Sequence, residues 1–174
     1  MIYISYEFTK NDRASQHEAG LRCRDRLFRL LGYEELIPQI YSGNNGRPCI
    51  GRADIDFSVT HSAHLAACAV ICNKDCPVPD DISMLPFSGS RVGFDAELID
   101  RSRSVENLSK VCRRWFGEDA GSHEELFDIW TRHEAVGKMY GDGVLCKAGS
   151  DGCYIRSYSL ENGDETYRLC ICAK

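Results

Sequence analysis

The sequence predicts an α+β fold, in which helices pack on mainly antiparallel strands. Three observations lead to this prediction. The 174 residues suffice to bury the core of one domain, or of two small halves. Segments rich in β-branched and aromatic residues are separated by stretches with the spacing of amphipathic helices. The chain closes with two strand-like segments around the turn sequence ENGDE, which is typical of a hairpin.

The first half of the chain is expected to contain one helix, from about Arg13 to Leu31, which Gly32 ends. The segments around this helix are a strand at 2–8, a Gly-, Asn- and Pro-rich loop at 41–54, and strands at 56–62 and 65–72. A Pro-, Ser- and Asp-rich connector follows at 73–90. We place the seam between two halves there, which gives domains at 1–90 and 91–174.

The second half is expected to form the strand RVGFDAELI, two helices and the closing hairpin. The first helix begins at Ser104 and ends at Gly117. Its apolar residues have the spacing of a buried stripe, and they are Leu108, Val111, Cys112, Trp115 and Phe116. The second helix begins at Ser122, which can form a capping box with Glu125, and runs to about Tyr140. The hairpin strands are expected at 153–160 and 166–173.

The composition excludes several classes of protein. A formal net charge of -5 disfavours nucleic-acid binding, which needs an excess of basic residues. Hydrophobic residues make up 43% of the chain, but they form no apolar run long enough to span a membrane. The start of the sequence lacks the basic flank and apolar core of a signal peptide. A cytoplasmic location is therefore expected.

Ten cysteines leave two interpretations open, buried thiols and a structural zinc site. Disulfides are disfavoured in the cytosol, and the sequence contains no CxxC pair. Cys68 and Cys72 fall in an expected strand, where they lie too far apart to bind one ion. Cys170 and Cys172 lie two residues apart in the last strand, where one buried face explains them. Core packing is therefore favoured over zinc.

Two acids, Asp95 and Glu97, lie within a strand that otherwise has the composition of a core. Side chains alternate along a strand, so both acids point to one face while Phe94 and Ala96 point to the other. Burying two like charges is unfavourable unless a cation compensates them. Mg²⁺ would do so, because it binds carboxylate oxygens and keeps waters that a phosphate can displace. A solvated face carrying two exposed acids is the alternative that this segment alone favours.

The helix segment WTRHEAVGK carries Trp130, Glu134 and Lys138 at intervals of four residues, and hence on one face. This face could supply a third carboxylate for a metal ion and a cation for phosphate oxygens. An ordinary Glu–Lys pair on a helix surface has the same spacing. The spacing by itself leaves both interpretations open.

The segments GRP, FSVTHS, GFDAE and WTRHEAVGK occur in this order along the chain. Together they resemble the 4′-phosphopantetheinyl transferases, and most closely the larger, surfactin-activating type. The family motifs G-K-P, F-N-[LI]-S-H-S, G-[VI]-D-[IVL]-E and W-x-x-K-E-[AS]-x-x-K correspond here to GRP, FSVTHS, GFDAE and WTRHEAVGK. They occur in the family's order, and the resemblance extends over residues 46 to 172. It implies a phosphopantetheinyl transferase fold, with two similar α+β halves forming a pseudo-dimer in one chain.

The resemblance implies that the phosphopantetheine arm of coenzyme A is transferred to a serine of an acyl or peptidyl carrier protein, with release of 3′,5′-ADP. Coenzyme A would be the co-substrate and Mg²⁺ the cofactor. Asp95, Glu97 and Glu134 would bind the metal ion. Glu134 could also accept the serine proton, directly or through water. Lys138 would steady the charge on the pyrophosphate.

The remaining implied contacts are to coenzyme A. Thr60 and His61 would contact its phosphates, and Arg47 with Pro48 would border the adenine. His133 replaces a lysine that approaches phosphate in the family.

The segment before Gly46 is short for this family type, and it normally supplies basic contacts to the 3′-phosphate. Lys10, Arg13 and His17 are candidates for these contacts, with a solvated helix face as the alternative for any single residue.

Two functional classes therefore remain open, an active transferase and a non-catalytic relative that binds coenzyme A or a carrier protein. His133 and the short N-terminal segment favour the second class. The intact set Asp95, Glu97, Glu134 and Lys138 favours the first, which we adopt. A chain with two halves is expected to act as a monomer.

Overall fold

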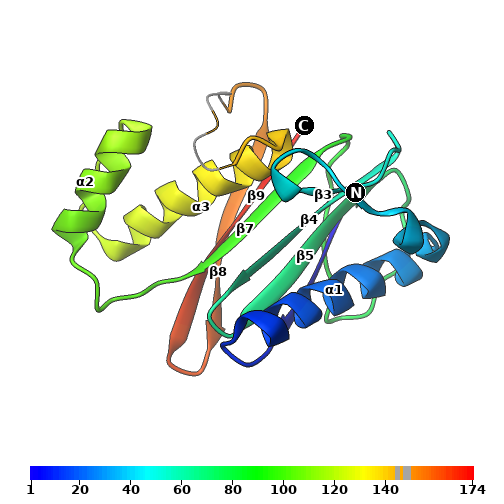
Figure 1. The fold of residues 1–174 in the computed structure, drawn as a ribbon, viewed down its shortest axis with the longest axis horizontal. Helices are drawn as coiled ribbons and strands as arrows, with labels where there is room; N and C mark the ends of the chain where they lie inside the picture. Colours follow the sequence, from blue (N-terminus) through cyan, green and yellow to red (C-terminus); the bar gives the residue numbers. More distant parts are fainter. Residues whose placement is uncertain (144–145, 147–149) are drawn as a thin grey trace.

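Two antiparallel sheets lie face to face between two long helices in the computed structural model, which describes residues 1–143, 146 and 150–174 (Figure 1). The first sheet has the strand order β4-β5-β1-β6 and the last has the order β7-β9-β8. The first sheet contains β1 (Ile2–Phe8), β4 (Ile55–Ser62), β5 (Leu65–Cys72) and β6 (Ser83–Leu85). The last contains β7 (Val92–Leu98), β8 (Tyr154–Asn162) and β9 (Glu165–Ala173). A small third sheet pairs β2 (Tyr41–Ser42) with β3 (Pro48–Cys49).

Helix α1 (Arg13–Leu30) covers the outer face of the first sheet. Asp12 caps its start by accepting a hydrogen bond from the backbone N–H of Ser15 at 2.9 Å, and Gly32 follows its end with a φ of +66°. Leu27 and Phe28 of the helix pack against Tyr3 and other buried residues of the sheet. A short 3₁₀ helix, η1 (Glu34–Gln39), leads from α1 to β2.

Helix α3 (His123–Tyr140) covers the outer face of the last sheet, and α2 (Val105–Phe116) packs on α3 at the end of the molecule (Figure 1). Ser122 caps α3 by accepting a hydrogen bond from Glu125 N at 3.2 Å. Gly93 lets this helix cross β7 closely, because a Cβ at Gly93 would lie 1.9 Å from the carbonyl oxygen of Ala135.

The main core lies between the inner faces of the two sheets. Ile4 and Ile71 of the first sheet contribute to it together with Phe94 and Ile171 of the last. All eight residues of β5 are buried, because this central strand has a sheet on one face and α1 on the other. This arrangement explains why its sequence is a continuous apolar run rather than an alternating pattern. Cys68 and Cys72 are part of that run and are buried as thiols.

The expected α+β class is confirmed, and the observed bounds of the strands and helices lie close to the expected ones. Three expectations were wrong. The segment at 41–54, expected to be a loop, contains the paired strands β2 and β3. The connector at 73–90 contains β6, which pairs with β1 at Ile2–Ile4. Trp115, expected in the buried stripe of its helix, is 46% exposed. None of the helices in the described part of the chain is long and apolar enough to span a membrane.

Candidate functional site

Strand β7 presents Asp95 and Glu97 on the face that α3 covers, and the opposite face presents Phe94 and Ala96 to the main core. This is the alternation that the sequence predicted. The close crossing at Gly93 brings the helix over the two acids. Strand and helix thus form one cluster of charged residues, which we name the acid cluster: Asp95, Glu97, Glu134 and Lys138.

Asp95 is the most buried member of the acid cluster, with an exposed fraction of 3%. Its Oδ1 accepts hydrogen bonds from Lys138 Nζ at 2.6 Å and from Thr60 Oγ1 at 3.1 Å. Its Oδ2 is buried and has no hydrogen-bond partner in the described part of the chain. A buried carboxylate oxygen without a donor is unfavourable, so this atom marks a place where a further cation or donor would be stabilising.

The other two carboxyl groups of the cluster are shifted toward their neutral forms. Burial, and then the charge of Asp95, raise the pKa of Glu97 from 4.5 to about 7. The same two causes raise the pKa of Glu134, while the charge of Lys138 opposes the rise. The cluster therefore has three carboxyl groups beside the single ammonium group of Lys138, and full ionisation of the three is unfavourable without a further cation.

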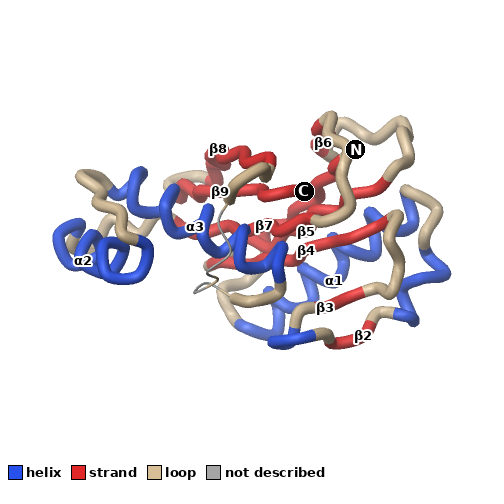
Figure 2. Tube along the Cα trace, turned by 90° about the horizontal axis from the view of Figure 1, so that it is seen from above, coloured by secondary structure: helices blue, strands red, loops and turns tan. Residues whose placement is uncertain are grey.

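Strand β4 of the first sheet lies beside β7 of the last sheet (Figure 2). A row of polar side chains on β4 joins the two sheets. Every second residue of β4 accepts a hydrogen bond from a backbone N–H of β7, at distances of 2.9 to 3.2 Å. The pairs are Asp56 with Val92, Ser58 with Phe94, Thr60 with Ala96, and Ser62 with Leu98. We name this row the side-chain ladder. It continues the hydrogen bonding of one sheet into the other without backbone pairing.

Two members of the ladder also hold the acids. Thr60 donates to Asp95, and Ser62 Oγ donates to Glu97 Oε2 at 2.7 Å. Thr60, which the resemblance assigned to a phosphate, is thus engaged with Asp95 and Lys138 in this structure. Ser62 was missed as a site residue. The alternation Asp-x-Ser-x-Thr-x-Ser from Asp56 to Ser62 is the signal that could have identified it.

His61 lies on β4 with its ring partly exposed and partly buried, near three basic groups. Burial of the ring, then the charge of Lys138, and then that of His17 lower the pKa of His61, with a smaller contribution from Arg13. Arg13 and His17 come from the first turns of α1, and both are exposed. The structure therefore brings these two residues to the same edge as His61 and the acid cluster.

Arg47 and Pro48 lie in the segment between β2 and β4, in which Pro48 begins β3, and this segment is bound to the end of α3. Asn45 Nδ2 donates to the carbonyl oxygen of Gly141 at 2.9 Å. A hollow of about 240 Å³ at this segment is lined by Arg47, Pro48 and Lys138. A second hollow, of about 360 Å³, lies between α2 and α3. Arg47 itself donates to Asp56 Oδ2 at 2.7 Å and to Val92 O at 3.2 Å.

His133 lies apart from the acid cluster. Its ring stacks on Phe116 with centroids 4.0 Å apart, and its Nε2 lies 2.8 Å from Glu118 Oε1. Arg132 also pairs with Glu118. His133, which the resemblance assigned to a phosphate, thus faces α2 and the loop after it in this structure. No sequence signal singled out Glu118.

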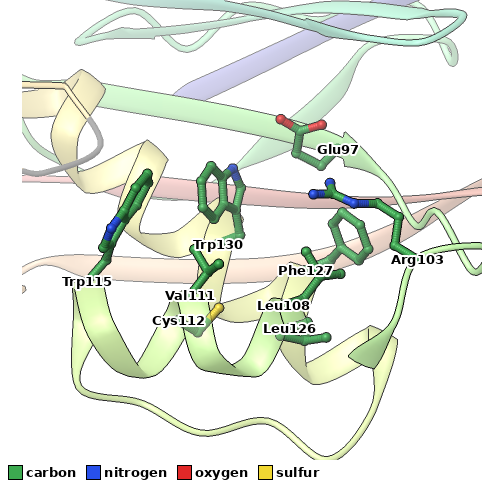
Figure 3. Close-up of a pocket in the computed structure, with 9 residues that line it drawn as sticks. All are labelled: Glu97, Arg103, Leu108, Val111, Cys112, Trp115, Leu126, Phe127 and Trp130. Carbon is green, nitrogen blue, oxygen red and sulfur yellow. The ribbon is translucent and has the colours of Figure 1, made fainter. Parts of the chain in front are cut away.

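The larger hollow, which we name the α2–α3 pocket, begins at Glu97 and extends between the two helices (Figure 3). Its volume is about 360 Å³. Apolar side chains form most of its wall, and they include Leu108, Val111, Trp115, Leu126, Phe127 and Trp130. One face of α3 therefore carries Trp130 in this pocket, Glu134 in the acid cluster and Lys138 at the smaller hollow.

Within the described residues, no three His, Cys, Asp or Glu side chains converge closely enough to form a complete protein-only metal site. The acid cluster thus offers carboxylates that affect one another electrostatically rather than a closed cage of ligands. Two comparisons with known proteins add no assignment, because neither the family models nor the curated proteins contain a match to this chain.

Proposed function

We propose that this protein transfers the 4′-phosphopantetheine arm of coenzyme A to a serine hydroxyl of an apo acyl or peptidyl carrier protein in the cytoplasm. The observation that carries the proposal is the unpartnered Oδ2 of buried Asp95, next to Glu97, Glu134 and Lys138. A cation would stabilise this group of buried carboxylates and would bind the oxygen that lacks a hydrogen-bond partner. The motif order GRP, FSVTHS, GFDAE and WTRHEAVGK, which resembles the phosphopantetheinyl transferases, names the reaction class.

The residues of the acid cluster fit Mg²⁺. This ion binds oxygen ligands, and in phosphoryl-transfer proteins it is held by one or two carboxylates together with waters and substrate phosphates. Asp95 and Glu97 supply such a pair, and Glu134 is a third acid close enough to affect the pKa of Glu97. When bound, Mg²⁺ would neutralise the charge of the pyrophosphate and of the leaving 3′,5′-ADP.

The protein's own residues then have distinct tasks. The ammonium group of Lys138 neutralises negative charge beside the phosphates as the bond to the leaving group breaks. Glu134, whose pKa is raised first by burial and then by Asp95, is suited to accept the proton of the carrier serine. The serine oxygen forms a bond to the phosphorus that carries the pantetheine arm, and 3′,5′-ADP leaves with the electron pair of the broken P–O bond. Thr60 and Ser62 hold Asp95 and Glu97 in position.

Coenzyme A binding is assigned to the basic edge and to the smaller hollow. Arg13, His17 and His61 offer positive charge or hydrogen bonds to phosphate oxygens, and they lie beside Lys138. Arg47 and Pro48 line, together with Lys138, the hollow of about 240 Å³ where the adenine would lie. The two layers of helix and sheet on either side of the main core agree with a pseudo-dimer of similar halves.

The proposal is tested by incubating the protein with coenzyme A, Mg²⁺ and a panel of apo carrier proteins, and weighing each carrier by intact mass spectrometry. We expect a gain of one phosphopantetheine arm, lost on chelation and in Asp95→Asn. Asp80→Asn is the matched control, because Asp80 is exposed and far from the cluster in the chain, and it should retain transfer. No gain on any carrier would contradict the proposal.

A second candidate function is a non-catalytic relative that binds coenzyme A or a carrier protein. The close pairing of Lys138 with Asp95 at 2.6 Å favours it, because this lysine already neutralises one of the expected metal ligands. Isothermal titration separates the two candidates. Coenzyme A binding that is independent of Mg²⁺, together with no transfer, would support the binding protein.

A further inference from the structure

No group of coenzyme A is assigned to the α2–α3 pocket, which is the larger of the two hollows described above beside the acid cluster. Its volume of about 360 Å³ lies in the range of small-molecule sites. Trp115 and Trp130 form part of the wall, with ring centroids 5.8 Å apart. Water gains few hydrogen bonds in such surroundings, so an apolar occupant is favoured.

Polar groups occur at one end of this pocket. Figure 3 shows the carboxyl group of Glu97 and the guanidinium group of Arg103 at that end, with the indole rings extending away from them. Arg103 is exposed, and its side chain forms no hydrogen bond or ion pair with any residue that the structure describes. Neighbouring Arg101, in contrast, pairs with Glu124 at 2.5 Å. A free guanidinium group at the end of an apolar pocket suits a ligand with an apolar body and a carboxylate.

The pocket's size limits the length of this ligand. A cavity of about 150 Å³ holds benzene, which has six carbon atoms. By that measure the α2–α3 pocket holds about 14 heavy atoms. Decanoate, with twelve, fits this estimate.

We propose that the α2–α3 pocket binds a medium-chain fatty carboxylate, with its alkyl chain between the aromatic rings of α2 and α3 and its carboxylate at Arg103. Helix α2 packs on α3 and forms one wall of the pocket, so a ligand there also contributes to holding α2 in place. The pocket and the acid cluster share Glu97. This inference stands independently of the transferase proposal.

Intrinsic fluorescence tests the inference directly, because both tryptophans of the chain line the pocket. Decanoate is titrated at constant pH and below its micelle concentration. We expect a saturable change in fluorescence. Across hexanoate, octanoate and decanoate the affinity should rise about fourfold for each methylene group, and it should level off once the chain exceeds the pocket.

Two variants assign the site. Val111→Phe fills the pocket and is expected to abolish the saturable change, whereas Asn107→Phe, an exposed position on the same helix, should retain it. Arg103→Gln should weaken decanoate about tenfold and leave decanol unchanged. Circular dichroism and the melting temperature verify that each variant folds.

Three results would overturn the inference. They are a fluorescence change that never saturates, decanoate binding by Val111→Phe that equals binding by the wild type, and displacement of bound decanoate when coenzyme A is added without a carrier protein. The last result would assign the pocket to the coenzyme. Carrier modification that proceeds normally while decanoate fails to bind would refute this inference and leave the proposed function intact. Decanoate binding without any carrier modification would support this inference and contradict the proposed function.

Discussion

Replacing Glu97 by glutamine is expected to remove a loss of stability that the protein undergoes between pH 5 and pH 8 in metal-free buffer. Burial, and then the charge of Asp95, raise the pKa of Glu97 from 4.5 to about 7 in the folded protein. A carboxyl group with a raised pKa binds protons more strongly when folded. Its contribution to stability is therefore complete below about pH 4.5 and is lost as the pH rises through about 7.

The magnitude follows from the two pKa values. At about 1.36 kcal/mol for each pH unit between them, the full contribution is about 3 kcal/mol. Between pH 5 and pH 8 the expected change is about 2.5 kcal/mol, because an unfolded carboxyl group is already partly ionised at pH 5. Glutamine keeps the shape of the side chain and an acceptor for Ser62 Oγ, which lies 2.7 Å from Glu97.

The assay is urea unfolding in EDTA at pH 5, 6, 7 and 8, for the wild type and for Glu97→Gln. The free energy of unfolding of the wild type, relative to that of the variant, should fall by about 2.5 kcal/mol over this range. Glu106→Gln is the matched control, because Glu106 is exposed on α2 and pairs with Lys110. This control should follow the wild-type curve. Parallel curves for the wild type and Glu97→Gln would refute the reasoning.

Three further outcomes are expected. Lys138→Met leaves buried Asp95 without its cation and should lower the free energy of unfolding by about 3 kcal/mol. Adding Asp95→Asn to this variant should largely reverse the loss. Losses that simply add in the double variant would contradict the coupling. Gly93→Ala forces a Cβ against the carbonyl oxygen of Ala135 and should cost about 3 kcal/mol or more, measured by thermal unfolding, whereas Gly121→Ala should be nearly neutral. Mg²⁺ should raise the melting temperature more at pH 8 than at pH 6, since protonated carboxyl groups cannot bind it; an equal effect at both pH values would argue against binding at the acid cluster.

Local sequence signals predicted the main strands and helices because each signal has a local physical cause. The hydroxyl of Ser122 caps α3 as expected, and Gly117 ends α2 in a left-handed conformation with a φ of 74°. Strand β6 was missed because its pairing with β1 depends on residues about eighty positions apart in the chain. Trp115 has the spacing of a buried stripe, but α2 packs on a single helix, which leaves part of that stripe uncovered.

The acid cluster could be predicted only in part. The alternation along β7 placed Asp95 and Glu97 on one face, and the four-residue spacing on α3 aligned Glu134 with Lys138. Whether the two elements face each other depends on the close crossing at Gly93, which no local pattern contains. The hydrogen bonds of the side-chain ladder likewise depend on how the two sheets meet. For this reason the tasks of Thr60 and Ser62 could not be read from their own segment.

The side-chain ladder also determines how the protein can be divided. Each sheet alone would expose an apolar face to water, and β4 would lose the four N–H donors of β7 that its side chains bind. A chain cut between Leu85 and Arg91 separates the sheets without breaking a strand. Each fragment would therefore be unstable in isolation, and the two would fold together when mixed. Co-expressed and fused to two interacting proteins, they would form a split reporter whose reassembly restores the acid cluster.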